Sequence, residues 1–204
     1  MPRILSDDDV LKSINRPSGL EQTPREILES HFNSIEAIPI KGGWGYTKDD
    51  AVIIDKDDHS VPKGLPFDGI GIEKIFVEKR TYEELIIFRK DGDKFNGINW
   101  ELLNQSLVQD NDKYYDVLKY KICGHLDGDW EFLKEEFERN DFFSDDPEGK
   151  DNHFEEHSNR LICYETEFWF DITSFFGKSH KNNYPMKLLR KVTKWFNFHV
   201  LKKM

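Results

Sequence analysis

The sequence that decides the fold is Asn99-Trp-Glu-Leu-Leu-Asn-Gln-Ser-Leu-Val-Gln109, followed by Lys113-Tyr-Tyr-Asp-Val-Leu-Lys-Tyr-Lys-Ile-Cys123. Apolar and aromatic residues recur along both runs, as they do in strands. Between the runs, Asn111-Asp112 supplies side chains that favour a tight turn. The pattern predicts a hairpin of two long strands, and long antiparallel strands follow from it.

Further elements are predicted on the N-terminal side of this hairpin. Ser6 precedes an acidic first turn, and Thr23-Pro-Arg-Glu26 combines a capping box with proline at the first helical position. These signals predict two short helices. Residues 38–40 and 51–55 read as strands on either side of a glycine-rich segment and a turn, and they predict a second hairpin.

Segment 70–89 fits two descriptions. The spacing of its apolar residues around Ile72 suits a helix, whereas residues 75–78 and 85–89 are typical of strands. The strand interpretation is preferred. Towards the C-terminus, Asp127-Gly-Asp129 is predicted to cap a helix over residues 130–139.

The remaining segments complete the predicted fold. Residues 140–152 are expected to form an acidic loop, residues 160–171 a strand, and Pro185 is expected to open a C-terminal amphipathic helix. The predicted class is α+β, in one domain over residues 1–204: a mainly antiparallel twisted sheet flanked by N-terminal helices, one middle helix and the C-terminal helix.

The formal net charge of −10 is unevenly distributed along the chain. Residues 178–204 hold eight Lys and Arg and no acid, so residues 1–177 hold 39 acids against 21 bases, a formal −18. An acidic body repels nucleic acid and anionic membranes and steers towards cationic molecules. We therefore expect a cationic protein partner, and neither nucleic acid nor a membrane as a ligand. The C-terminal helix is expected to dock on the acidic body.

The cysteines and the N-terminus indicate the cytoplasm. Only Cys123 and Cys163 are present, whereas a secreted disulfide scaffold normally carries more, so buried free thiols are expected. The first residues include no apolar segment of a signal peptide, and no apolar run reaches the ~20 residues that span a bilayer.

One short motif carries specific chemistry. His153-Phe-Glu-Glu-His157 matches H-x-x-E-H and resembles the motif of the inverzincins, a class of zinc hydrolases. Over these five residues, the resemblance implies that His153 and His157 bind zinc while Glu156 activates water. That chemistry requires a helix and a third ligand, whereas a loop followed by a strand is expected here. A metal-dependent hydrolase therefore stays an alternative.

Other catalytic and cofactor motifs do not match. Gly42-Gly-Trp-Gly45 lacks the Lys-Ser/Thr of a phosphate-binding loop, and no G-x-S-x-G elbow occurs. His125 lies at a predicted strand-to-helix corner, where a capped turn explains it. No catalytic residue is assigned, no cofactor is expected, and a non-enzymatic protein is preferred.

In general character, small, acidic and rich in aromatic residues, the chain resembles the immunity proteins that block bacterial toxins such as nucleases. The resemblance implies a carboxylate-rich face that mimics a phosphate array. The expected contact residues lie on the middle helix and the following loop: Asp129, Glu131, Glu135, Glu138, Asp141, Asp145 and Asp146.

A third hypothesis belongs to a different class. The C-terminal helix could serve as an interface, which would make the chain a self-associating adaptor. The sequence leaves the oligomeric state open.

Overall fold

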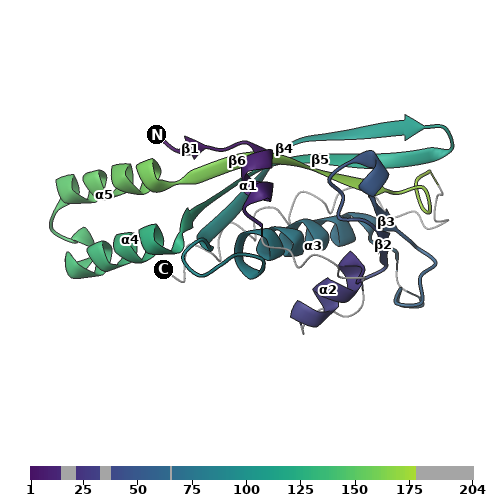
Figure 1. The fold of residues 1–204 in the computed structure, drawn as a ribbon, viewed down its shortest axis with the longest axis horizontal. Coiled ribbons are helices and arrows are strands. Elements are labelled where there is room, and N and C mark those ends of the chain that lie inside the picture. Colours follow the sequence, from purple (N-terminus) through teal and green to yellow (C-terminus); the bar gives the residue numbers. More distant parts are fainter. Residues whose placement is uncertain (15–21, 33–37, 65, 178–204) are drawn as a thin grey trace.

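A computed structural model describes residues 1–14, 22–32, 38–64 and 66–177 (Figure 1). Helices α4 (Asp127–Arg139) and α5 (Pro147–Arg160) lie at one end of a sheet, and the turn between its two longest strands lies at the other end. The predicted helix from Pro185 to the C-terminus falls outside the described residues. Among the described residues, no helix is both long and apolar enough to cross a membrane.

In this part of the chain, the sheet has six strands and is mainly antiparallel. Its order is β2-β3-β6-β5-β4, and the short β1 also pairs with β6. The α+β class is confirmed, but β3 and β1 run parallel to β6, which makes the sheet mixed. The strands are β1 (Arg3–Ile4), β2 (Ile40–Gly42), β3 (Val52–Ile54), β4 (Phe95–Asp110), β5 (Lys113–Leu126) and β6 (Ile162–Asp171).

The long hairpin is confirmed as β4 and β5, which pair antiparallel from Asp110 opposite Lys113 to Phe95 opposite Leu126. Asn111 occupies the turn with a φ of 54°, a conformation that asparagine tolerates better than most residues. The second hairpin and the strand at β6 are also confirmed. Strand β5 pairs with β4 on one side and with β6 on the other, so β5 and β6 lie at the centre of the sheet.

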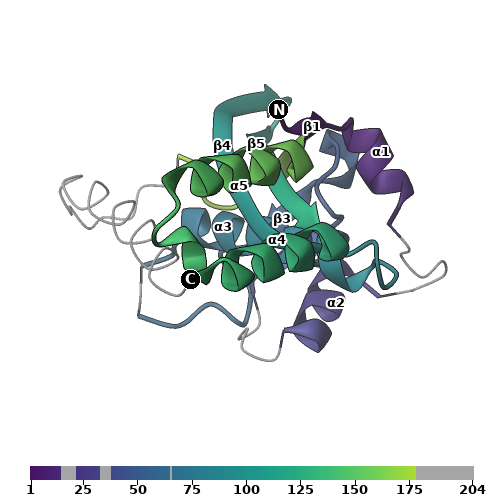
Figure 2. The same cartoon turned by 90° about the vertical axis from the view of Figure 1, so that its left-hand side faces the viewer.

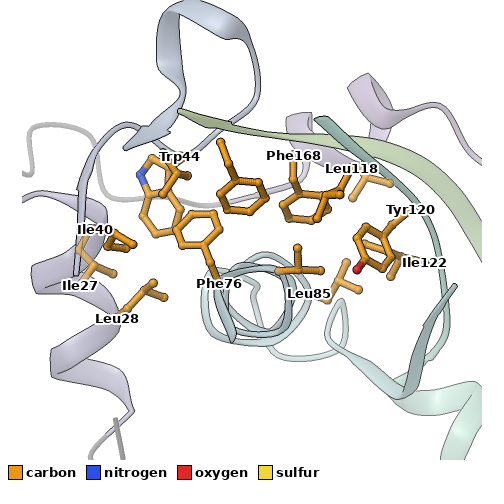
Figure 3. Packing of buried hydrophobic residues seen from close by; sticks show 14 of the residues in the cluster. Ile27, Leu28, Ile40, Trp44, Phe76, Leu85, Leu118, Tyr120, Ile122 and Phe168 are labelled. Atoms are coloured by element: carbon orange, nitrogen blue, oxygen red, sulfur yellow. The ribbon is translucent and has the colours of Figure 1, made fainter. Parts of the chain in front are cut away.

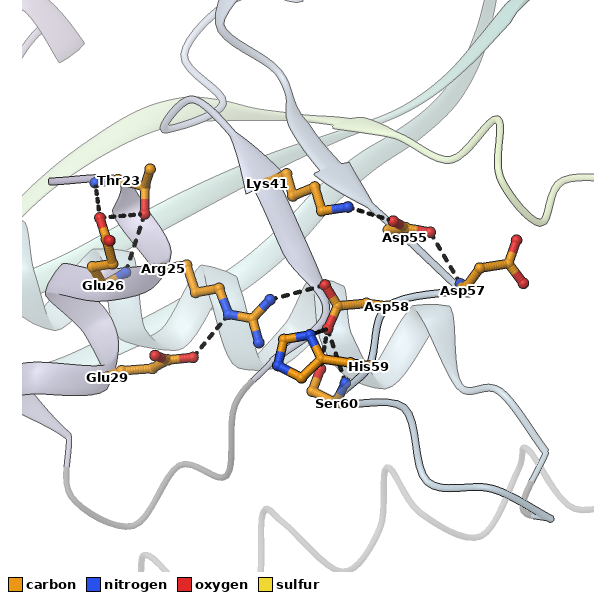
Figure 4. A network of polar contacts seen from close by, with 10 residues as sticks. All are labelled: Thr23, Arg25, Glu26, Glu29, Lys41, Asp55, Asp57, Asp58, His59 and Ser60. Atoms are coloured by element: carbon orange, nitrogen blue, oxygen red, sulfur yellow. Dashed lines mark hydrogen bonds and ion pairs between the residues drawn. The ribbon is translucent and has the colours of Figure 1, made fainter.

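The two N-terminal helices are confirmed as α1 (Asp7–Lys12) and α2 (Pro24–His31). The Thr23 and Glu26 side chains form the reciprocal hydrogen bonds of a capping box. Figure 4 shows how α2 is held against the segment after β3: Arg25 Nη1 donates to Asp58 Oδ2 at 2.9 Å. Burial alone would raise the pKa of Asp58, but hydrogen bonds from Ser60 and the Arg25 guanidinium lower it to about 2.

The strand prediction for 70–89 is wrong, because this segment is helical. Helix α3 spans Gly69–Tyr82 and continues into η2, a π-helical turn over Glu83–Ile87. The Asp68 carboxylate caps the helix by accepting from the Gly71 N–H at 2.9 Å. Consecutive apolar residues suit a strand and a buried helix equally, and packing of α3 against the sheet decides between them.

Helices α1, α2 and α3 and one face of the sheet share a single hydrophobic cluster (Figure 3). Phe76 of α3 is fully buried, and its ring centroid lies 5.7 Å from that of Phe170 on β6. Trp44, from the segment between β2 and β3, packs against Phe76 at 6.4 Å. This cluster fixes α3 under the sheet, and it includes no residue of α4 or α5.

The free-thiol prediction is also wrong. Cys123 on β5 and Cys163 on β6 are directly opposite in the register and form a disulfide, with their Cα atoms 4.1 Å apart. Forty positions separate the two cysteines in the sequence, so only strand pairing brings them together. Because disulfides persist mainly in oxidising compartments, the cysteines no longer support the cytoplasmic expectation.

Candidate functional site

Helices α4 and α5 form an antiparallel helical hairpin that connects β5 to β6 and lies beyond the end of the sheet (Figure 2). We call residues 127–160 the α4–α5 hairpin. The middle helix is confirmed, but it begins at Asp127, and its N-cap residue is Leu126, so the predicted aspartate cap is wrong. Asp127 and Asp129 instead occupy the first turn, where the helix dipole favours acids.

The acidic loop predicted over 140–152 is largely helical. A short turn, η3 (Asp141–Phe143), follows α4, and α5 begins at Pro147. The Asp146 carboxylate caps α5 by accepting from the Gly149 N–H at 2.9 Å. The sequence concealed this helix because, after Pro147 in its first turn, Phe154 is the sole large hydrophobic side chain in α5, which leaves no apolar periodicity to detect.

The inner face of the α4–α5 hairpin has a small core of its own. Leu133, Phe143 and His153 are buried in it. The His153 ring stacks on Phe137 with centroids 5.2 Å apart, and its Nδ1 lies 2.7 Å from Glu136 Oε2. His153 is therefore a packed and hydrogen-bonded histidine that holds the two helices together.

The outer face carries most of the charge. Residues 127–160 hold 13 acids and four Lys and Arg, a formal −9, which is half of the −18 carried by residues 1–177. The bases are already counted in this −9, and exposed pairs such as Glu135 with Arg139 at 3.9 Å are weak. The hairpin therefore presents a concentrated negative surface at one end of the molecule.

Most of the predicted contact residues lie on this surface. Asp129 is half-buried and ion-paired, since Arg160 Nη1 donates to its Oδ1 at 2.6 Å, and Asp146 caps α5. Asp129 and Asp146 therefore have structural roles. The other five predicted contact residues are exposed and cap no helix: Glu131, Glu135, Glu138, Asp141 and Asp145.

The turn between the helices displays an aromatic ring. Asp141, Phe142 and Phe143 all have positive φ, of 48°, 57° and 52°. For L-residues, this left-handed backbone costs roughly 1–2 kcal/mol per residue. Burial of Phe143 between the helices holds the turn in place, while Phe142 remains 56% exposed. Strain of this kind often marks a functional segment.

Sequence reasoning missed the exposed aromatic residues of the hairpin. Besides Phe142, Phe132 is 44% exposed and Phe154 is 51% exposed. The Arg160 guanidinium lies 4.3 Å from the centroid of the Phe132 ring. One feature of the sequence could have indicated these exposed rings: the segment is strongly acidic yet contains several phenylalanines, whereas ordinary solvated loops contain few.

The H-x-x-E-H motif lies in α5, so its context is helical and not the loop that was expected. Its side chains are nevertheless engaged separately: His153 with Glu136, and Glu156 with Arg160 Nε at 2.7 Å. Among the described residues, no group of three His, Cys, Asp or Glu could hold a metal ion. The helix supplies the spacing of a zinc site without gathering its ligands.

His157 belongs to a histidine pair where the hairpin meets the sheet. Its ring centroid lies 4.2 Å from that of His125, and the His125 Nε2–H donates to the His157 carbonyl oxygen at 3.1 Å. Burial lowers the pKa of both histidines. Trp130 packs beside the pair, so His125 joins β5 to α5 through packing and not through a simple capped turn.

A second polar cluster lies under the sheet, around Arg80 of α3. Its Nε donates to Glu84 Oε1 at 2.8 Å, and the Tyr46 hydroxyl donates to the same carboxylate. Arg80 is 0% exposed and Glu84 is 1% exposed, so neither has surface for a substrate. This cluster joins α3 to the sheet and to the segment between β2 and β3.

A buried carboxyl pair lies between α3 and β5. Burial raises the pKa of Glu73 to about 8, and the charges of Asp116 and Asp68 act in the same direction. Burial also raises the pKa of Asp116, against the hydrogen bond that it accepts from Gln105 at 2.5 Å. Carboxyls with a raised pKa can act as general acids in catalysis. Glu73 is only 3% exposed, so a substrate has no surface on which to reach it.

Replacing Glu73 by glutamine is expected to stabilise the protein at neutral pH. The folded pKa of about 8 exceeds the ordinary value of 4.5, so stability falls as pH rises between these values. Glutamine mimics the protonated carboxyl, and the gain at pH 7 is on the order of 2–3 kcal/mol. Urea unfolding of both proteins from pH 4 to pH 8 measures it; parallel stability curves would contradict the assignment.

No protein-family model matches the chain, and searches of curated proteins and of solved structures give no match. Function is therefore inferred from the residues of the chain itself.

Proposed function

We propose that this chain is a non-enzymatic binding protein of the immunity type, which neutralises a cationic bacterial toxin such as a nuclease through the α4–α5 hairpin. The observation that supports this most is the joint presence of nine net negative charges and the exposed Phe142 on one projecting hairpin. Carboxylates steer a basic protein into contact, and a desolvated aromatic ring supplies affinity at the centre of an interface.

The shape of the hairpin suits this function. The five exposed predicted residues run along α4 and around the turn, where Phe142 is held outward by the buried Phe143. A preformed turn does not have to be ordered on binding, which reduces the entropic cost of association. Strong steering also implies fast association that weakens as salt is added.

The alternatives have less support. A zinc hydrolase would require His153 to leave Glu136 and the core of the hairpin. The adaptor hypothesis depends on the helix predicted from Pro185 onward, a segment that lies outside the described residues. Neither gains support from the exposed surface of the hairpin.

Removing hairpin charge is expected to weaken partner binding. In this experiment, the full chain captures basic proteins from its host at low salt, and the dissociation constant of the purified partner is then measured. The triple variant Glu131→Gln/Glu135→Gln/Glu138→Gln should weaken binding about tenfold or more, and Phe142→Ser by a similar factor.

The matched control is Asp49→Asn/Asp93→Asn/Asp112→Asn, which removes three exposed acids outside the hairpin. It should leave the dissociation constant within about twofold, because screened charges at a distance contribute little. Recovery of neutral or acidic partners alone, or equal effects of the two triple variants, would disprove the proposal.

A further inference from the structure

Strand β4 lies at an open edge of the sheet. The sheet order ends at β4, which among the described residues pairs only with β5. Over its 16 residues, the opposite side of the backbone therefore has no strand partner in the described chain. An edge of this length is a template for another strand, and proteins usually protect such edges.

The usual protecting features are missing from most of β4. From Phe95 to Gln109 there is one charged residue, Glu101, and there is no lysine or proline, although 33% of the whole chain is charged. Register shifts interrupt the pairing near Asn96 and near Leu102. From Asn104 to Asp110 the pairing with β5 is regular, so seven residues present an undistorted edge.

The edge also exposes apolar side chains. Leu102, Leu103 and Leu107 are 45%, 42% and 53% exposed. Leu107 is the most exposed of the three and lies at the middle of the regular segment 104–110. A strand added here would bury Leu107 at its centre.

We infer that β4 pairs antiparallel with β4 of a second copy of this chain, about a two-fold axis at Leu107. In that register, Leu107 lies opposite its own copy, Gln105 opposite Gln109, and Asn104 opposite Asp110. The pairing is self-complementary, as a two-fold interface requires, and it places no like charges opposite each other.

The low charge of the β4 edge favours a second copy over a strongly charged partner. Two chains of net charge −10 repel each other, and the α4–α5 hairpin at the far end from the β4–β5 turn carries −9. An edge with few charges, whose β4–β5 turn lies far from the α4–α5 hairpin, keeps this repulsion small where the two copies meet. A cationic partner gains little from a strand with two carboxylates, Glu101 and Asp110, of which Asp110 is already ion-paired with Lys48. This inference is independent of the proposed function.

The test uses the full chain and a charge exchange at the axis. Sedimentation velocity over a wide range of concentration should show a dimer for the unmodified chain. Leu107→Lys and Leu107→Glu should each weaken dimerisation about tenfold or more, because like charges then meet at the centre. A mixture of the two variants should dimerise again, which unfolded variants could not do.

The control is Ile70→Lys, which adds a lysine at a residue of α3 that is 50% exposed and should leave the dimer unchanged. Hydrogen exchange of residues 104–110 should slow as concentration rises. A monomer at every concentration overturns the inference. This holds also if hydrogen exchange shows that another part of the same chain protects the β4 amides. A dimer that is insensitive to both Leu107 variants overturns it as well.

Discussion

Arg80→Met is expected to lower the free energy of unfolding by about 3–5 kcal/mol, the loss that follows when one partner of a buried ion pair is removed. The methionine would leave the Glu84 carboxylate buried with its positive partner gone. It would also remove the donor to three backbone carbonyls, those of Trp44, Gly45 and Glu167, at 3.2, 3.4 and 3.3 Å. Urea unfolding at neutral pH measures the loss.

A double-variant cycle separates the charge pair from the rest of this network. Glu84→Gln alone should also destabilise the protein, since Arg80 then loses its counterion. The double variant Arg80→Met/Glu84→Gln should lose less than the sum of the single losses, because no unpaired charge is left buried. Simple additivity, or a loss below about 1 kcal/mol for Arg80→Met, would show that the pair is not coupled as described.

The double variant Cys123→Ala/Cys163→Ala is expected to lose about 2–4 kcal/mol of stability. The bond closes a loop that contains the whole α4–α5 hairpin, because the two cysteines have a sequence separation of 40. Without the bond, the unfolded chain regains conformational freedom. Thermal or urea unfolding with and without a thiol reductant measures the effect.

The reductant itself provides the control. It should destabilise the unmodified protein by a similar amount and leave the double variant unchanged. If the unmodified protein unfolds at the same urea concentration with and without reductant, the disulfide does not contribute to stability.

Two elements show why local pattern alone was not enough. Segment 70–89 is apolar enough for either a strand or a helix, and the choice depends on contacts of Phe76 and Arg80 with distant strands. Helix α5 lacks apolar periodicity and is held by its Asp146 cap and by the packing of His153 on α4. In α3 the deciding interactions join residues that are far apart in the sequence, whereas in α5 a local cap acts together with a contact between the two helices.

The candidate surface could be predicted only in part. Its charge could be counted in the sequence, and five of the seven predicted carboxylates are exposed on it without a capping role. The exposure of Phe142 could not be predicted, because it depends on a left-handed turn held by the buried Phe143. Whether an aromatic ring is buried or displayed is a property of its packed neighbours.

By itself, the sequence determined the long hairpin, the N-terminal helices and the acidity of the middle segment, since alternation, caps and charge act within a few residues. The tertiary structure decided the helical state of α3 and α5, the bond between Cys123 and Cys163, and the burial of Arg80 with Glu84. These features depend on which distant segments meet, and burial then changes both the stability of backbone conformations and the energy of charges.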